Sequence, residues 1–183
     1  MIIKELSLLR LPEVFHLISE ILSEEYQPEV LVFLQSAWPQ GQLLMLAPDG
    51  EVMGFLLGAW SGESESRIMM FGIRPQYRGM GLGSLLLQEF QRRTMMRKGE
   101  AIRLEVRPDN MEAINFYMRR GFHLVGFIPQ YYKDGGDGLL MRKVISGTSD
   151  PRYADYAGST GISPSGNQIR PMTGHACRSR NGP

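Results

Sequence analysis

The chain has 183 residues, of which 43% are hydrophobic and 21% charged, and this composition fits one globular domain with its own core. Its formal net charge of +1 lacks the basic excess of nucleic-acid-binding proteins, so we expect no direct nucleic-acid partner. The N-terminus does not read as a secretory signal, and no apolar run approaches the ~20 residues of a membrane span, so a cytoplasmic protein without a membrane partner is expected.

Apolar spacing changes period repeatedly along residues 2–145. Proline favours a helix start at residue 28, and Pro48-Asp49-Gly50 between two apolar runs predicts an antiparallel hairpin. Gly121 stands where a helix would end in a left-handed cap. In chain order, the predicted elements are a strand at 2–9, helices at 11–25 and 28–37, strands at 42–47, 52–60 and 67–74, a helix at 82–97, a strand at 101–107, a helix at 111–120, and strands at 122–128 and 139–145. This order predicts a mixed α/β sheet with helices between strands.

The composition shifts sharply after residue 145. Residues 146–183 contain no Leu, Val, Phe or Trp and are rich in Gly, Ser and Pro, so we predict a flexible tail that lies outside the folded domain at 1–145. The single cysteine, Cys177, cannot form an internal disulfide, and with the scattered histidines it makes no metal-ligand set. We therefore expect no metal site.

A glycine-rich turn stands between the strand at 67–74 and the helix at 82–97. Such a turn binds phosphate, because glycines let the backbone approach an anion and the first amides of the helix donate to it. A P-loop would need a lysine before Ser84, and a Rossmann turn would need a glycine at Ser84 or at Leu86. A glycine-rich turn without function is the remaining alternative.

The pattern Arg78-x-x-Gly81-x-Gly83 resembles the turn by which GNAT acetyltransferases hold the pyrophosphate of coenzyme A. A second block, from Asn110 through Ala113 and Tyr117 to Gly121, resembles the family's Asn-x-x-Ala-x-x-x-Tyr-x-x-x-Gly-Phe motif. The resemblance implies the GNAT fold, a mostly antiparallel twisted sheet flanked by helices. It also implies an enzyme that transfers acetyl from acetyl-CoA directly to an amine in a ternary complex.

Within the family, the chain resembles the protein N-terminal acetyltransferases, including the ribosomal-protein alanine type. The resemblance rests on Leu-Glu-Val-Arg at 104–107 and on Tyr131-Tyr132 in a Tyr-Tyr-x-x-Gly-Glu-Asp-Ala pattern, in which Gly136 and Gly138 replace the usual Glu and Ala. It implies that the acceptor is the N-terminus of a protein or peptide. An auxiliary subunit or a ribosome contact stays open.

The resemblance also implies the catalytic roles. Glu105 is expected to be the general base, and Tyr117 is expected to protonate the leaving thiolate. For each residue, a purely structural role is the alternative. For Glu105 the alternative is a salt bridge to Arg103 or Arg107, and for Tyr117 it is a core position.

The remaining expected contacts concern the coenzyme and the acceptor. Backbone amides near Phe71 to Ile73 should polarise the thioester carbonyl, and Asn110 should contact the coenzyme, cap a helix, or do both. The full coenzyme set is Phe71, Gly72, Ile73, Arg78, Gly79, Met80, Gly81, Leu82, Gly83, Ser84, Asn110 and Tyr117. The acceptor set is Glu24, Tyr26, Tyr131 and Tyr132. Residues 24–27 and 36–40 resemble the catalytic subunit of the eukaryotic and archaeal N-terminal acetyltransferases, in which the first two helices frame the peptide entrance. For Tyr26 and Trp38 the alternative is a core position.

Two competing functions stay open at the level of sequence. One is acetylation of a small amine by the same chemistry. The other is a non-catalytic sensor or adaptor that binds acyl-CoA.

Overall fold

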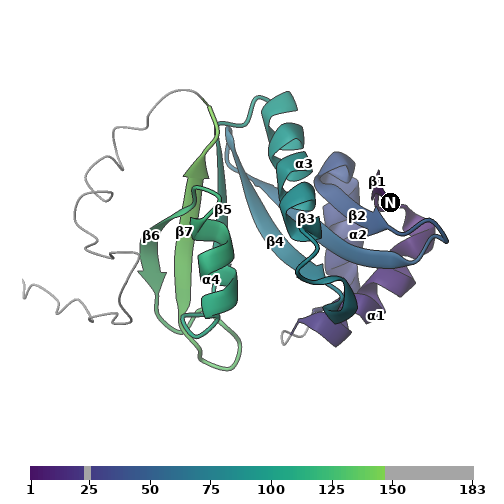
Figure 1. The fold of residues 1–183 in the computed structure, drawn as a ribbon. Helices are drawn as coiled ribbons and strands as arrows, with labels where there is room; N and C mark the ends of the chain where they lie inside the picture. The colour runs from purple at the N-terminus through teal and green to yellow at the C-terminus, as the bar shows by residue number, and fades with distance from the viewer. Residues whose placement is uncertain (23–25, 147–183) are drawn as a thin grey trace, which may run out of the picture.

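The computed structural model describes residues 1–22 and 26–146. Over these residues the chain forms a seven-stranded mixed sheet in the order β1-β2-β3-β4-β5-β7-β6 (Figure 1). The described part of the chain contains no helix that is both long and apolar enough to cross a membrane. The predicted α/β class and the mostly antiparallel sheet are confirmed.

The elements follow the predicted order closely. The strands are β1 (Ile2–Glu5), β2 (Gln42–Leu46), β3 (Val52–Ser61), β4 (Glu65–Ile73), β5 (Ala101–Val106), β6 (His123–Ile128) and β7 (Gly138–Val144). The helices are α1 (Leu11–Ile21), α2 (Pro28–Ala37), α3 (Leu82–Met96) and α4 (Met111–Met118), with short 3-10 helices at Leu8–Arg10, Pro39–Gly41 and Pro75–Tyr77.

Two predicted boundaries near the N-terminus were too long. The strand predicted at 2–9 ends at Glu5, because the chain turns into a 3-10 helix whose leucines are not buried. The helix predicted at 11–25 ends at Ile21, since Leu22 takes an extended backbone conformation. Apolar residues just beyond an element continued its pattern, which made both elements look longer than they are.

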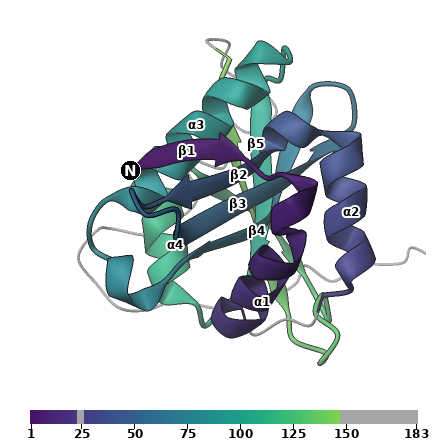
Figure 2. The same cartoon turned by 90° about the vertical axis from the view of Figure 1, so that its right-hand side faces the viewer.

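Helices cover both faces of the sheet. Figure 2 shows α1 and α2 in front of the strands and α3 and α4 behind them. Each face has its own core. One joins α1 and α2 to the sheet through residues such as Leu17, Leu34 and Phe55, and the other joins α3 and α4 through Phe90 and Tyr117.

The strands β4 and β5 form the single parallel pair among the described strands, and they pair over a short stretch. Their register runs from Glu65↔Ala101 to Ile68↔Leu104, after which β4 continues to Ile73 and pairs with β3 alone. A β-bulge at Met69 lies at the point of separation, because Leu57↔Met70 is followed by Gly58↔Ile68. The sheet therefore opens between its two halves, as Figure 1 shows.

Candidate functional site

The glycine-rich turn connects β4 to the start of α3. Gly79 and Gly81 have positive φ angles of 76° and 80°, and Gly81 is the N-cap of α3. A Cβ built on either residue would meet no described atom within 4 Å, so the turn faces open space. The first amides of a helix lack acceptors within the helix. The turn thus fits a phosphate group, as the sequence predicts.

The neighbours of this turn differ in exposure. Arg78 is exposed and its Nε donates to the carbonyl of Ile73 at 3.1 Å, while Met80 is 63% exposed. Leu82 is buried in the core that α3 shares with the sheet. Leu82 can therefore offer its backbone amide to a ligand, but its side chain anchors the helix.

Arg120, which had no predicted role, lies beside the first turn of α3. Its Nη2 donates to the hydroxyl of Ser84 and its Nη1 to the carbonyl of Phe116 at 2.7 Å, and its guanidinium stacks 3.6 Å from the Phe116 ring centre. Burial lowers the pKa of Arg120 and of Lys143. These two cations line a cavity of about 210 Å³ between α3, the end of α4 and β7. Only the fold could reveal this neighbourhood, since the residues are far apart in sequence.

The edge of β4 beyond Met69 faces the opening in the sheet. Phe71, Gly72 and Ile73 pair with β3 on one side, and pairing with β5 ends before them within the described register. Backbone groups on the side of β5 are thus available to a ligand arm. The bulge at Met69, which had no signal in the sequence pattern, bends the backbone of β4 here.

Tyr117 lies at the opening, on the face covered by α3 and α4. It is 6% exposed, and its ring lies 5.2 Å from Phe116, 5.3 Å from Phe122 and 6.3 Å from Phe71. Burial, with a smaller contribution from Tyr132, raises the pKa of Tyr117 well above its usual value. Tyr117 therefore stays protonated at neutral pH. The ring also occupies the core position that was the alternative for Tyr117.

Asn110 and Gly121 bound α4 as the sequence predicts. The Asn110 side chain accepts from the amide of Ala113 at 3.1 Å, so the residue caps the helix. Gly121 has φ of 81° in the left-handed region. Together they fix the short helix that carries Tyr117.

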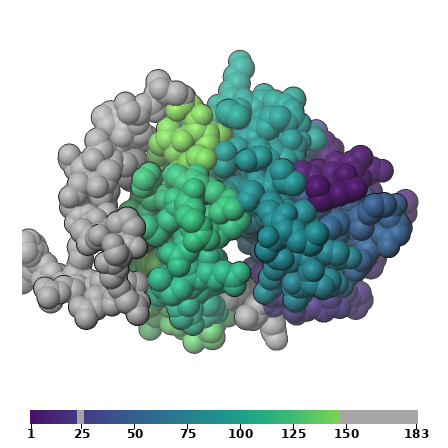
Figure 3. All heavy atoms as spheres, in the orientation of Figure 1, coloured from purple at the N-terminus to yellow at the C-terminus, as the bar shows by residue number. Residues whose placement is uncertain are grey.

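Glu105 points to the opposite face of the sheet from Tyr117. Its neighbours Leu104 and Val106 belong to the core beneath α3 and α4, and alternate residues of a strand face opposite sides. The two predicted catalytic residues thus approach the opening from its two sides. Figure 3 shows the molecule hollowed between α4 and the turn before α3.

The Glu105 carboxylate is 7% exposed and ion-paired. Its partner is Arg67 on β4, whose Nε donates to Oε2 at 2.7 Å. The alternative to the base role was a salt bridge to Arg103 or Arg107, and an ion pair does form, but with neither of these partners. Arg103 pairs with Glu65 instead, and Arg107 with Asp134.

Tyr131 and Tyr132 lie together in the loop between β6 and β7. Their rings meet edge to face at 4.9 Å, and Arg67 donates through Nη2 to the Tyr131 hydroxyl. Burial and the charge of Glu105 raise the pKa of Tyr131. The structure thus brings Glu105 and Tyr131, predicted in separate roles, onto one guanidinium.

The two glycines that depart from the family pattern lie at the end of this loop, Gly136 within it and Gly138 as the first residue of β7. A Cβ on Gly136 would come 2.6 Å from Nη1 of Arg107, and a Cβ on Gly138 would come 3.0 Å from the Tyr131 ring. Arg107 therefore takes the space beside Gly136. The acid that it meets there is Asp134, at 3.1 Å.

The other predicted acceptor residues lie near the α1–α2 connection. Glu24 falls outside the described residues. Tyr26 is partly buried against the core of α1 and α2, as its alternative foresaw, and Trp38 is 2% exposed in the opposite core. Trp38 is thus a core residue.

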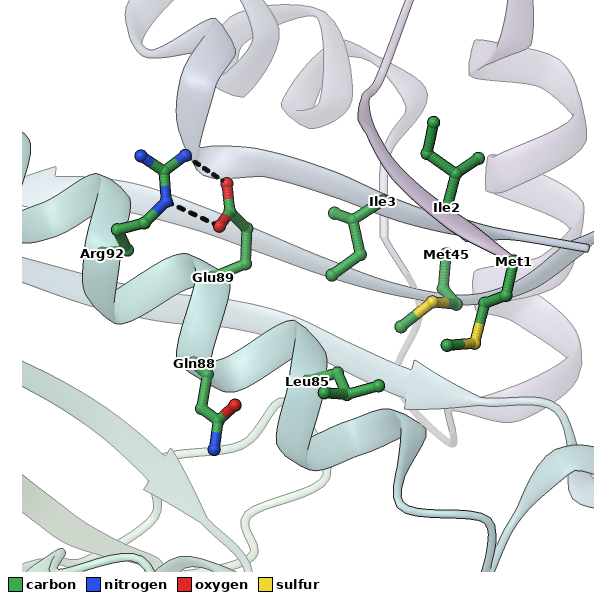
Figure 4. Close-up of a pocket in the computed structure, with 8 residues that line it drawn as sticks. All are labelled: Met1, Ile2, Ile3, Met45, Leu85, Gln88, Glu89 and Arg92. Atoms are coloured by element: carbon green, nitrogen blue, oxygen red, sulfur yellow. Dashed lines mark hydrogen bonds and ion pairs between the residues drawn. The ribbon is translucent and has the colours of Figure 1, made fainter.

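The larger cavity, of about 360 Å³, lies away from all of these residues. It is bounded by Met1 to Ile3 of β1, Met45 and the face of α3 that carries Leu85 and Glu89 (Figure 4). Its polar edge is closed by the Glu89–Arg92 ion pair. None of the predicted site residues lines it.

Comparisons with known proteins agree with this arrangement. The family model described as "Acetyltransferase (GNAT) family" matches residues 11–122. An uncharacterised N-acetyltransferase of Methanocaldococcus jannaschii is 30% identical over 144 residues, which cover 78% of this chain and 91% of that protein. An N-alpha-acetyltransferase of Sulfurisphaera tokodaii is 32% identical over 105 residues, or 51% of this chain and 63% of that protein. The crystal structure of Ard1 from Thermoplasma volcanium superposes with a TM-score of 0.73 at 32% identity, covering 78% of this chain and 96% of that one.

Proposed function

The chain belongs to the acetyltransferase (GNAT) family, and from that premise we propose that it acetylates the N-terminal α-amine of a protein or peptide. The supporting observation is the opening between β4 and β5. The phosphate-binding turn and Tyr117 border it on one face, and Glu105 with Tyr131 borders it on the other. The proposed catalytic unit is residues 1–145, working in the cytoplasm.

The residues present fit acetyl-CoA, which supplies the activated acetyl group when bound. Gly79 and Gly81 leave room for the pyrophosphate, and Arg78 adds a positive charge beside it. The edge of β4 from Phe71 to Ile73 offers backbone groups to the extended arm. An amide there can also donate to the carbonyl oxygen as it gains charge.

On the acceptor side, the amine must be neutral before it can attack. A free α-amine has a pKa of about 8, so most of it is protonated at neutral pH. Glu105 takes the proton, directly or through water, and the nitrogen then bonds to the acetyl carbon as the carbon–sulfur bond breaks. Acetylation of an ammonium group thus yields an amide, a free thiol and one released proton.

On the coenzyme side, Tyr117 supports the departing sulfur. Because its pKa is raised, it is a weaker acid than a thiol of pKa near 8.5. Full proton transfer from Tyr117 to the thiolate is therefore uphill. We infer that it acts chiefly as a hydrogen-bond donor that stabilises the thiolate until solvent protonates it.

A peptide acceptor is favoured over a small amine by two observations. The S. tokodaii relative is an N-alpha-acetyltransferase and the similar solved structure is an Ard1. The acceptor side of the opening also carries Tyr131 and Tyr132 on a loop held from two strands, which suits an extended chain with repeated polar groups.

The test is acetyl-CoA turnover against two matched panels. One contains short peptides that differ at their first two residues, each also made with a blocked N-terminus, and the other contains polyamines and aminoglycosides. We expect turnover with free peptide N-termini alone. Turnover confined to the small amines would show that the acceptor is a small amine and not a peptide. Coenzyme binding without any turnover would favour the non-catalytic sensor or adaptor.

A further inference from the structure

A single guanidinium joins the two acceptor-side groups. Arg67 donates from Nε to Glu105 at 2.7 Å and from Nη2 to the hydroxyl of Tyr131. Its side chain is 24% exposed, and that of Glu105 is 7% exposed. This contact is therefore sheltered enough for geometry and charge to matter more than at the surface.

The position of Arg67 in the sheet is equally specific. It faces Arg103 of β5, one pair before the last paired residues Ile68 and Leu104. Glu105 follows immediately, where the strands separate. The guanidinium thus ties β4 to β5 and to the β6–β7 loop at the inner end of the opening.

The charge of Arg67 bears on the protonation of the acceptor. An unpaired, buried carboxylate would hold an incoming ammonium as a cation, whereas a nearby guanidinium favours the neutral amine. On the Glu105 side of the sheet, the charged and titratable groups are Arg67 and Glu65 of β4, Tyr131 of the loop, Arg103 of β5, Arg107 just after it, and Arg142 of β7, which pairs with Glu65 at 2.6 Å.

Those other groups do not replace Arg67. Arg103 and Arg107 pair with Glu65 and Asp134. The residue of β7 opposite Glu105 is the apolar Leu140. Among the described groups, the ion pair with Glu105 is formed by Arg67.

We propose that Arg67 is a positioning residue for acetyl transfer, which orients the Glu105 carboxylate, holds Tyr131 over the acceptor, and favours the neutral form of the bound amine. The proposal rests on the function proposed above. Arg67 touches neither the coenzyme turn nor Tyr117 in the contacts described, so its effects belong to the acceptor side.

The test compares Arg67→Met and Arg67→Lys with Arg103→Met. The control removes a cation from the register partner of Arg67, on the same face and with a carboxylate partner of its own. Kinetics with a peptide acceptor are measured from pH 6 to 9.5, with coenzyme affinity by calorimetry and folding by thermal melting.

For Arg67→Met we expect kcat to fall on the order of 100-fold at pH 7, and the rising limb of the kcat–pH profile, which reports the bound amine, to move up by about one unit, so that the loss shrinks at pH 9.5. Arg67→Lys should restore the position of the rising limb on the pH axis, because the positive charge is kept. It should not restore the peptide KM, because a lysine lacks the forked guanidinium donors that reach both Glu105 and Tyr131. Coenzyme affinity should stay unchanged in both.

The proposal would be overturned if the rising limb of the pH profile in Arg67→Met stayed at its wild-type position. It would also be overturned if Arg103→Met changed the kinetics as much as Arg67→Met does. Failure of the proposed function is separable from this outcome. If the wild type acetylates a small amine and no peptide, the same pH profiles are measured with that amine, and the shift of the limb still decides the role of Arg67.

Discussion

The guanidinium carbon of Arg107 lies 4.0 Å from the ring centre of Tyr132. The same side chain reaches Asp134 at 3.1 Å, and Asp134 accepts from the amide of Gly136 at 3.0 Å. The end of β5 thus holds the loop that carries both tyrosines. A Cβ on Gly136 would come 2.6 Å from Nη1 of Arg107, so a larger residue there would require the flexible end of this arginine to shift.

Replacing Arg107 by leucine should loosen this loop. A cation–π contact is worth about 0.5–2 kcal/mol, so we expect the peptide KM to rise roughly 3- to 10-fold with a smaller change in kcat. Arg119→Leu, an exposed arginine on α4, is the control. Unchanged peptide KM would show that the loop is held by other contacts.

Replacing Tyr117 by phenylalanine should reduce kcat while preserving the fold. The ring contacts with Phe71, Phe116 and Phe122 do not need the hydroxyl. Loss of one donor to a developing charge costs on the order of 100- to 1,000-fold in kcat.

The wild-type pH profile tests the same residue from another side. Because burial raises the pKa of Tyr117 above 10, its deprotonation should cause no fall in kcat as pH rises through 10. An alkaline limb below pH 10 that disappears in Tyr117→Phe would contradict the buried, protonated hydroxyl.

The sequence predicted what depends on local chemistry. Gly121 has the positive φ angle predicted for it, and Asn110 caps its helix, because such features need few residues. The β-bulge at Met69 and the separation of β4 from β5 depend on register between strands that are far apart in sequence. The pattern of apolar residues within each strand does not indicate which residues of the two strands pair.

Charge partners were the least predictable part of the site. The salt bridge that was the alternative role of Glu105 would have stayed within its own strand, yet residues two apart on a strand compete with residues on the neighbouring strand. Arg67, 38 residues earlier in the chain, is closer once β4 and β5 align. Arg120 and Ser84, 36 residues apart, meet for the same reason.

Replacing Glu105 by glutamine tests the base directly. The amide keeps an oxygen for Arg67 but accepts a proton poorly, so kcat at pH 7 should fall on the order of 100- to 1,000-fold. The deficit should narrow as pH rises, because solvent then deprotonates the amine. Coenzyme affinity serves as the control, and a rate at the wild-type level across pH would reject the base role.

Replacing Gly81 by alanine should weaken coenzyme binding through the backbone. A side chain in the left-handed conformation costs about 1–2 kcal/mol, and the open space around Gly81 means that no collision adds to it. Relaxation of the turn should therefore raise the coenzyme Kd several-fold and lower Tm by a few degrees. Gly62→Ala, at another positive φ in open space but in the turn between β3 and β4, should lower Tm without changing Kd.

Replacing Arg120 by methionine tests whether its charge supports the coenzyme phosphates. The guanidinium bonds to Ser84 in the first turn of α3, where helix amides and a positive charge act on the same anion. Methionine can keep the contact with the Phe116 ring, so the fold should persist while the coenzyme Kd rises about 5- to 20-fold. Measured against salt, the slope of log Kd should flatten, because one cation no longer takes part. Arg119→Met is the control, because it removes a nearby charge that faces solvent. If the coenzyme Kd rises in Arg120→Met while the salt dependence of log Kd is unchanged, Arg120 acts by packing and not by its charge.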